Sequence, residues 1–391
     1  MDKLQYGSLN TVTDLQLEVL SPVHVGTAGE KLLIENMDFV YRDGQVVLFD
    51  KKRMLQLLAG AYTGNNRPAL KAYQQLMAAG KLWELEGFLE DCSIDLEEIT
   101  AKEHPLRVAP ANEIRPLIRT GRGRPIIPGS SIKGAIRSVL FHHLFEMHGV
   151  EDRRKADREL FGDIGNNIMS YIRPYDVEVA VDQVGMINID LFNLYEAYGD
   201  WESDYKEQFF LSVEAFLPGA GGKLRLTVAD GLLEKLQKEE SQLRHANRLP
   251  KPLTPKFVND VISTANPIDR LFELINRYTR THITREIEFF TRFQQAADTE
   301  FTIQNLEKFQ ALTHDADACV LRLAYGSGFH AITGDYRFPD HTSTIYRPDQ
   351  LNQTWDRSTR SRRPARYKSR KITGSDLDTT ALGYVKLSKS Q

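Results

Sequence analysis

Hydrophobic and polar residues alternate along several short segments, and this two-residue period is typical of strands with one buried face. Leu15, Leu17 and Val19 predict a first strand. Asp43-Gly44 separates two apolar runs and predicts a hairpin, because both residues tolerate a positive φ angle. Further strands are predicted at residues 176–182, 209–216, 224–228, 319–324 and 383–387. A glycine turn at 219–222 is expected to join the strands at 209–216 and 224–228 into a second hairpin.

Other segments repeat apolar residues every three or four positions, as helices with one buried face do. This pattern predicts helices within residues 51–99 and 231–312, the second region being interrupted by prolines between 250 and 255. A further helix over 132–147 is expected to start at a Ser130 or Ser131 N-cap and to end at Gly149. Strands mixed with separate helical blocks indicate an α+β fold.

The length of 391 residues corresponds to two or three domains of ordinary size. The net charge of −3 does not attract nucleic acid to the whole protein, so any nucleic-acid site must be a local basic patch.

The two cysteines, Cys92 and Cys319, do not suggest a disulfide framework and favour a cytoplasmic location. No apolar run reaches about 18 residues, so neither a membrane span nor a membrane partner is expected.

Positive charge is concentrated before and within the start of the helix predicted at 132–147. Between residues 104 and 137, Glu113 is the only acid among seven lysines and arginines. A lysine in the first turn opposes the helix dipole, and a bound anion would reverse that cost. The segment therefore predicts a phosphate site, with Ser130, Ser131, Lys133 and Arg137 gripping phosphates and Arg115, Arg119, Arg122 and Arg124 forming a mobile arm over RNA or a neighbouring subunit.

Three other features are candidates for RNA contact. His24 follows the first strand and is a candidate RNA contact or general base, or a residue that holds the turn. Gly326 and Gly328 follow a later strand and lie either against a phosphate or in a tight turn. The arginine-rich tail from residue 357 to 371, with Trp355 and Tyr367 nearby, is either solvated or stacked on bases.

The chain lacks the spacings typical of cofactor and metal sites. No P-loop or dinucleotide fingerprint is present, so no cofactor is expected. His142, His143 and His148 do not form a metal-binding pair four residues apart on a helix, so no metal is expected either.

Residues 127–137, Ile-Pro-Gly-Ser-Ser-Ile-Lys-Gly-Ala-Ile-Arg, resemble the signature of the RAMP superfamily of CRISPR-associated proteins. Flanking motifs narrow the resemblance to the fifth subunits of the type III-A Csm interference complex; they lie at 21–26, 112–115, 160–163 and 381–387. The resemblance implies two RRM-like (ferredoxin-like) domains with helical insertions. The first is expected at 1–205 with an insertion at about 51–103, and the second at 206–391 with a helical block at about 231–312 and the basic tail.

The resemblance also implies a function. It points to a non-catalytic, crRNA-binding subunit that caps the 3′ side of the guide RNA and is needed for crRNA maturation in antiviral defence. Its expected partners are crRNA, the other Csm subunits and host trimming nucleases. In related backbone subunits an aspartate near the start of the chain cuts target RNA; Asp38 or Asp43 is the nearest candidate here, although no motif supports that role.

Two alternatives remain open. The first is a metal-independent endoribonuclease of the same superfamily, in which His24 acts as general base for attack of a 2′-hydroxyl on the adjacent phosphate. The second is a scaffold whose basic loop meets an acidic partner instead of RNA.

Overall fold

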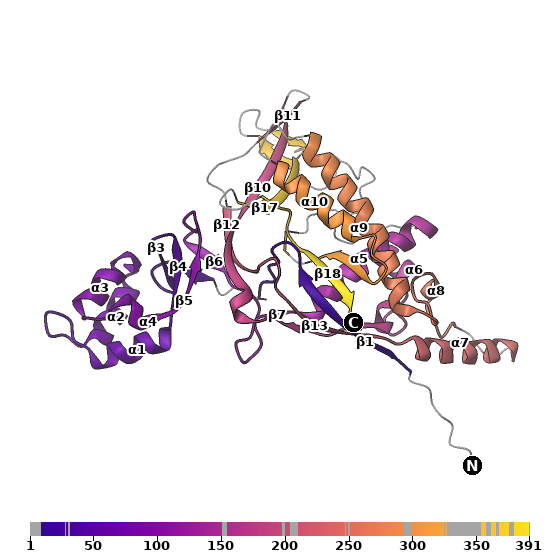
Figure 1. Cartoon of the computed structure of the whole chain (residues 1–391), viewed down its shortest axis with the longest axis horizontal. Coiled ribbons are helices and arrows are strands. Elements are labelled where there is room, and N and C mark those ends of the chain that lie inside the picture. The colour runs from indigo at the N-terminus through magenta and orange to yellow at the C-terminus, as the bar shows by residue number, and fades with distance from the viewer. Residues whose placement is uncertain are drawn as a thin grey trace, which may run out of the picture.

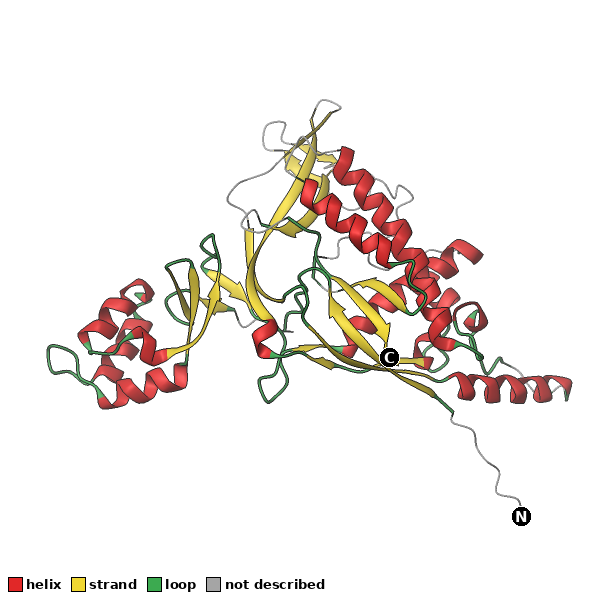
Figure 2. Cartoon of the chain, in the orientation of Figure 1, coloured by secondary structure: helices red, strands yellow, loops and turns green. Residues whose placement is uncertain are grey.

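The computed structural model describes residues 9–27, 29, 32–150, 155–197, 200–203, 210–246, 248, 251–292, 299–323, 325–326, 353–356, 361–364, 367–374 and 379–390. Two large sheets, smaller sheets and several blocks of helices make up the fold (Figure 2). The α+β class predicted from the sequence is therefore confirmed.

The first large sheet is antiparallel and contains both the first and the last strand of the described chain. Its five strands follow the order β14 (Ala318–Arg322), β18 (Tyr384–Lys389), β1 (Thr11–Val19), β13 (Gly221–Val228) and β8 (Ile172–Pro174). Helices α5 (Gly129–His148) and α9 (Pro267–Arg292) pack together beside it (Figure 1). The predictions for β1, β14 and β18 are confirmed.

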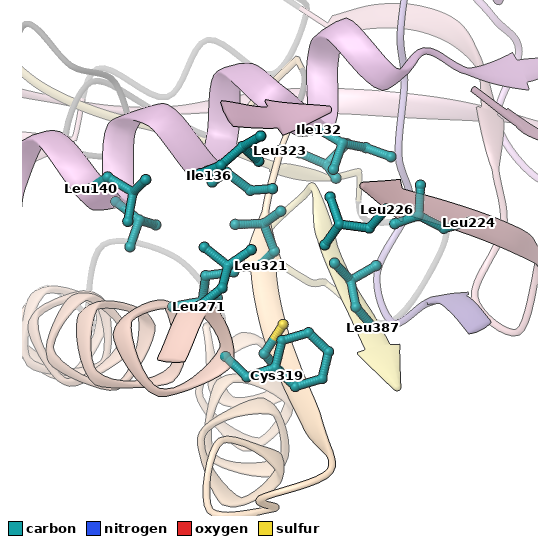
Figure 3. Packing of buried hydrophobic residues seen from close by; sticks show 14 of the residues in the cluster. Ile132, Ile136, Leu140, Leu224, Leu226, Leu271, Cys319, Leu321, Leu323 and Leu387 are labelled. Carbon is teal, nitrogen blue, oxygen red and sulfur yellow. The ribbon is translucent and has the colours of Figure 1, made fainter. Parts of the chain in front are cut away.

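The main core lies between this sheet and its helices. Ile132, Ile136 and Leu140 recur at helical spacing on α5 and face Leu224 and Leu321 of the sheet (Figure 3). All five side chains are almost completely inaccessible to solvent. Full burial of one such side chain contributes about 1.5–3 kcal/mol, so the apolar stripe of α5 fixes the position of the basic helix start.

The second large sheet stands beside the first. Its path runs through β11 (Asp200–Ser203), β10 (Val184–Ala197), β12 (Phe210–Phe216), β6 (Glu113–Arg115) and β2 (Leu33–Ile34). Strand β17 (Tyr367–Thr373) also pairs with β10, over the part that runs from Ile189 to Tyr195. Part of the expected basic tail is thus a strand of this sheet.

A separate unit projects at the left of Figure 1. It consists of β3 (Phe39–Arg42), β4 (Gln45–Phe49), α1 (Lys51–Gly60), α2 (Ala69–Ala78), the 3-10 turn Leu82–Glu84, α3 (Leu85–Asp91), α4 (Leu96–Ile99) and β5 (Thr100–Pro105). Asp43 and Gly44 have φ angles of 52° and 76°, which confirms the first hairpin. The unit has its own apolar core, around Met54, Leu58 and Leu85.

The second helical block covers one side of the molecule. It contains α7 (Asp230–His245), α8 (Val258–Val261), α9 and α10 (Glu300–Leu312), with α6 (Ala156–Phe161) nearby. Residues 251–257 are not helical, which confirms the interruption predicted from the prolines. The remaining short elements are β7 (Ile126–Ile127) with β9 (Val177–Glu178), β15 (Gln353–Asp356) with β16 (Ser361–Pro364), and the 3-10 turns Ile168–Tyr171 and Val181–Gln183.

The second predicted hairpin is wrong. β12 and β13 both exist, but they belong to different sheets: β12 pairs with β10 and β6, and β13 pairs with β1 and β8. The connection crosses between the sheets because its backbone bonds elsewhere: Leu217 donates to the Gln183 carbonyl (3.1 Å) and Gly219 to the Val19 carbonyl (2.8 Å). Of the strand predicted at 176–182, the structure has only the short strand β9. Strand β10 was not predicted from the sequence.

Each large sheet combines strands from both sides of residue 205. In the first sheet β1 lies between β13 and β18, so strands from the beginning, middle and end of the chain are neighbours. The division into units at 1–205 and 206–391 stays a prediction.

Candidate nucleic-acid interface

The start of α5 is capped by another part of the chain. The helix begins at Gly129 after Pro128, so the prediction of a Ser130 or Ser131 N-cap is wrong. The Asp176 carboxylate accepts from the Gly129 N–H at 2.8 Å. It therefore caps the helix in place of the expected serine hydroxyl. Glycine is required here because a Cβ would overlap the Pro174 carbonyl oxygen. Ser130 is exposed beside this cap, and its contact with phosphate stays a prediction.

Lys133 is the basic side chain of this helix start that has no carboxylate partner among the described residues. Its ammonium forms no ion pair with any residue that the structure describes, whereas Arg173 on β8 lies close enough to repel it. Burial first, and Arg173 second, lower the pKa of Lys133. Because the helix starts at Gly129, Lys133 is its fifth residue and lies in the second turn, one turn later than predicted. With Arg173 beside it, it still places two cations near the positive end of a 20-residue helix, where they favour a bound anion. Arg173 was missed from the sequence, where no motif or periodic pattern marks it.

Arg137, in contrast, is engaged inside the protein. Its guanidinium forms an ion pair with Asp157 on α6 and lies 5.1 Å from the centre of the Phe161 ring. These contacts attach α6 to the third turn of α5. They give Arg137 a structural role inside the protein, and its contact with phosphate stays a prediction.

The expected arginine arm is an anchored turn. Thr120 N–H donates to the Arg124 carbonyl and Gly123 N–H to the Thr120 carbonyl, both at 2.8 Å. Arg119 pairs with Glu214 at 2.7 Å, and that carboxylate is only 3% exposed. Arg124 pairs with Glu178 at 2.8 Å on the surface. Arg122, at the exposed tip, forms no ion pair with the described residues and is the arginine of this turn best placed to meet a ligand.

A small pocket gathers several of the other predicted residues. His24, Gly26, Thr27, Leu32, Arg115, Pro116 and Tyr325 line a cavity of about 160 Å³. Tyr325 is its aromatic centre: the Lys371 ammonium lies 3.8 Å from the ring centre and the Arg115 guanidinium 5.8 Å. The His24 ring meets Tyr325 edge-on at 5.6 Å. We call this group the His24 pocket; Tyr325 and Lys371 were not among the predicted site residues.

His24 holds the pocket together. Its ring is 4% exposed, and its Nδ1 lies 2.7 Å from the Glu214 carbonyl oxygen. A carbonyl oxygen can only accept, so Nδ1 carries the hydrogen and donates it to the Glu214 carbonyl. A Cβ on Gly26 would lie 3.1 Å from Nε2, which explains the glycine beside the histidine. The geometry matches the turn-holding interpretation of His24.

Gly326 forms a tight turn next to Tyr325. Its φ of 85° suits glycine, and a Cβ would lie 2.6 Å from a Leu382 methyl group. Arg322 donates to the Gly326 carbonyl at 3.3 Å. Gly328, the other glycine predicted at this site, lies outside the described residues.

A buried ion triad supports this turn. The Glu286 carboxylate on α9 accepts from Arg322 at 3.2 Å and from Arg370 at 2.8 Å. Arg370 belongs to the arginine-rich tail, yet it is buried, so at this position the tail is neither solvated nor available to RNA. The next residue, Lys371, reaches the His24 pocket.

The aspartates considered as cutting residues have local roles. Asp38 accepts from the Ile34 N–H at 2.9 Å and pairs with Lys51, while Asp43 pairs with Arg42 at 3.4 Å in the hairpin turn. Within the described ranges, no group of three or more histidines, cysteines or acids is arranged to hold a metal ion. Among the helices of those ranges, none is long and apolar enough to cross a membrane.

Comparison with known proteins gives a consistent result. The model of the RAMP superfamily matches residues 16–329. The chain is 30% identical over 136 residues to the CRISPR system protein Csm5 of Streptococcus thermophilus, a match that covers 33% of this chain and 37% of that relative. The matched segment therefore spans little more than a third of the curated relative.

Two solved structures share the fold over nearly the whole chain. One is a chain of the cryo-EM structure of a Csm–crRNA–target RNA ternary complex in a type III-A CRISPR–Cas system, with a TM-score of 0.60 and 19% identity, covering 96% of this chain and 100% of that one. The other is the crystal structure of T. onnurineus Csm5, also with a TM-score of 0.60 and 19% identity, covering 95% and 99%. At this identity the likeness concerns the fold.

Proposed function

Because the chain belongs to the RAMP superfamily, we propose that it is a crRNA-binding subunit of a type III-A Csm complex. The observation that carries the proposal is the pair formed by Lys133 on α5 and Arg173 on β8, the strand whose Pro174 carbonyl lies against Gly129 at the helix start. Their charges repel each other and lack carboxylate partners among the described residues, so phosphate would relieve the repulsion. Guide RNA held by its backbone needs such sequence-blind cations.

The His24 pocket supplies a second contact of a different kind. Arg115 and Lys371 surround the Tyr325 ring, and a base or sugar-phosphate unit at the pocket mouth would meet both cation and aromatic surface. His24 shapes this pocket through the Glu214 carbonyl and is only 4% exposed. Because so little of His24 can reach a substrate, we favour a binding subunit over the endoribonuclease alternative.

The proposal includes the finer role drawn from the family. The subunit caps the 3′ side of the crRNA, is needed for crRNA maturation and works with other Csm subunits in cytoplasmic antiviral defence. The two RRM-like units belong to the same proposal. The comparisons give no support for a direct partnership with trimming nucleases.

A double variant tests the function. Lys133→Ala with Arg173→Ala is expected to lose most crRNA during purification of the Csm complex, because two phosphate contacts disappear. Arg137→Ala is avoided, since Arg137 attaches α6 through Asp157. The matched control is Lys52→Ala with Lys71→Ala, two exposed lysines of the projecting unit. Unchanged crRNA retention in the Lys133/Arg173 variant, with the fold intact by circular dichroism, would refute the assignment.

A further inference from the structure

A second basic groove lies away from the His24 pocket, between α6 and the loop at 251–256. Its volume is about 650 Å³, and its lining includes Lys155, Arg158, Lys251 and Lys256 against the acids Glu159 and Asp163. Arg158 and Asp163 neutralise each other in an ion pair. On a chain of net charge −3, this excess of cations in one groove is a local positive site.

The loop that carries Lys251 and Lys256 is held in place by Glu240 of α7. The Glu240 carboxylate accepts from the N–H groups of Leu253 (3.2 Å) and Thr254 (3.1 Å) and from the Thr254 hydroxyl (2.9 Å). Asn166 donates to the Pro252 carbonyl from the opposite wall at 3.5 Å. The two lysines therefore project from a fixed backbone, which lowers the entropy lost when they bind a ligand.

Lys251 and Lys256 lack a carboxylate partner in the part of the chain that the structure describes. Lys251 and Lys256 are exposed and form no ion pair with any described residue, and the Lys256 ammonium rests 4.6 Å from the Phe257 ring centre. Among the described residues that line the groove, none is aromatic. Protein interfaces are depleted in lysine and usually rely on buried aromatic or arginine anchors. The lining thus suits phosphates, and it offers no surface on which bases could stack.

The groove is also connected to the proposed crRNA site. α6 and α8 both pack against α5 (Figure 1), and the Arg137–Asp157 ion pair joins the third turn of α5 to α6. Lys133 lies one helical turn before Arg137. We propose that this groove binds the phosphate backbone of single-stranded RNA and extends the footprint of the RNA beyond Lys133. The inference rests on the proposed function, because it takes the same RNA as its ligand.

The test measures salt dependence of RNA binding by the purified full chain. Fluorescence anisotropy with a single-stranded repeat-derived RNA compares wild type, Lys251→Ala/Lys256→Ala and the control Lys52→Ala/Lys71→Ala between about 50 and 200 mM salt. Each lost phosphate contact on a single strand lowers the slope of log K against log salt by about 0.7, so the groove variant is expected to lose about 1.4. Photo-crosslinking of 4-thiouridine RNA is expected to label the 251–256 loop.

The outcomes separate the two proposals. An unchanged slope in the groove variant, together with weakened binding by Lys133→Ala/Arg173→Ala, overturns the groove and leaves the crRNA site. Unchanged binding in both variants overturns both. If the groove variant binds RNA normally but fails to join the other Csm subunits, the groove is a protein interface and the inference is wrong.

Discussion

At the scale of single residues, the least ordinary feature is the charge buried around Glu286. Among the described residues, one carboxylate faces two guanidinium groups, so these three buried side chains carry more positive than negative charge. Aromatic faces compensate: Arg370 lies 4.0 Å from the Phe289 ring centre and Arg322 4.9 Å from that of Tyr384. Burial raises the pKa of Tyr384 to about 12, so its hydroxyl adds no negative charge. The triad joins α9, β14 and β17 behind the His24 pocket.

Glu286→Gln is expected to lower the free energy of unfolding by about 3–5 kcal/mol, because it removes the carboxylate that two buried guanidinium groups share. Urea unfolding followed by circular dichroism measures the change. Glu273→Gln is the control, since the Glu273 side chain that pairs with Arg270 is 58% exposed and surface pairs contribute about 0–1 kcal/mol. Equal effects of the two substitutions would contradict a structural role for the triad.

At the scale of elements, the start of α5 depends on a residue far away in the sequence. Asp176→Ala removes the acceptor of the Gly129 N–H and is expected to destabilise the protein by about 0.5–2 kcal/mol. Asp176→Asn keeps a side-chain oxygen and should recover most of the loss. The comparison is made by thermal unfolding at neutral pH. A loss of stability as large in the asparagine variant would show that Asp176 acts through its charge and not as a cap.

Local sequence signals predicted individual helices and strands well, but they predicted poorly which strands pair with each other. Asp43-Gly44 determines its own turn, and the repeat of Ile132, Ile136 and Leu140 determines one helix face, so both features could be read from neighbouring residues. Strands β12 and β13 were also located, but their partners depend on residues such as Val19 that bond to the connection from elsewhere. The sequence did not predict Asp176 as the cap of α5 for the same reason, because Asp176 is distant from Gly129 along the chain.

At the scale of the molecule, the candidate site is an assembly of distant segments. His24, Arg115, Tyr325 and Lys371 come from four separate elements or loops and meet because β1, β6, β17 and the turn after β14 converge. The sequence singled out His24 and Arg115 separately. It could not reveal that Lys371 joins them while Arg370, its neighbour, points into the core. Alternation along β17 separates the two, and that strand became visible only through its pairing with β10.

The whole molecule is also expected to lose stability in mild acid. Burial, followed by the charges of Lys102 and Arg119, lowers the pKa of His104 to about 4, and burial with Arg277 and Arg270 lowers the pKa of His143. The unfolded chain therefore takes up these protons near pH 6.5, before the folded chain does. Stability is complete above pH 6.5 and falls between 6.5 and about 4, with a slope approaching about 1.4 kcal/mol per pH unit for each differing proton.

Urea unfolding at several pH values between 8 and 4.5 measures this slope. His104→Leu places an apolar side chain in the buried site on β5. It should reduce the slope of the unfolding free energy against pH by the contribution of up to one proton, whatever the stability of the variant at pH 8. His245→Gln, on the exposed end of α7, is the control and should leave the curve unchanged. A slope in His104→Leu equal to that of the wild type would mean that His104 takes up its proton equally in the folded and unfolded chain, and that the acid sensitivity arises elsewhere.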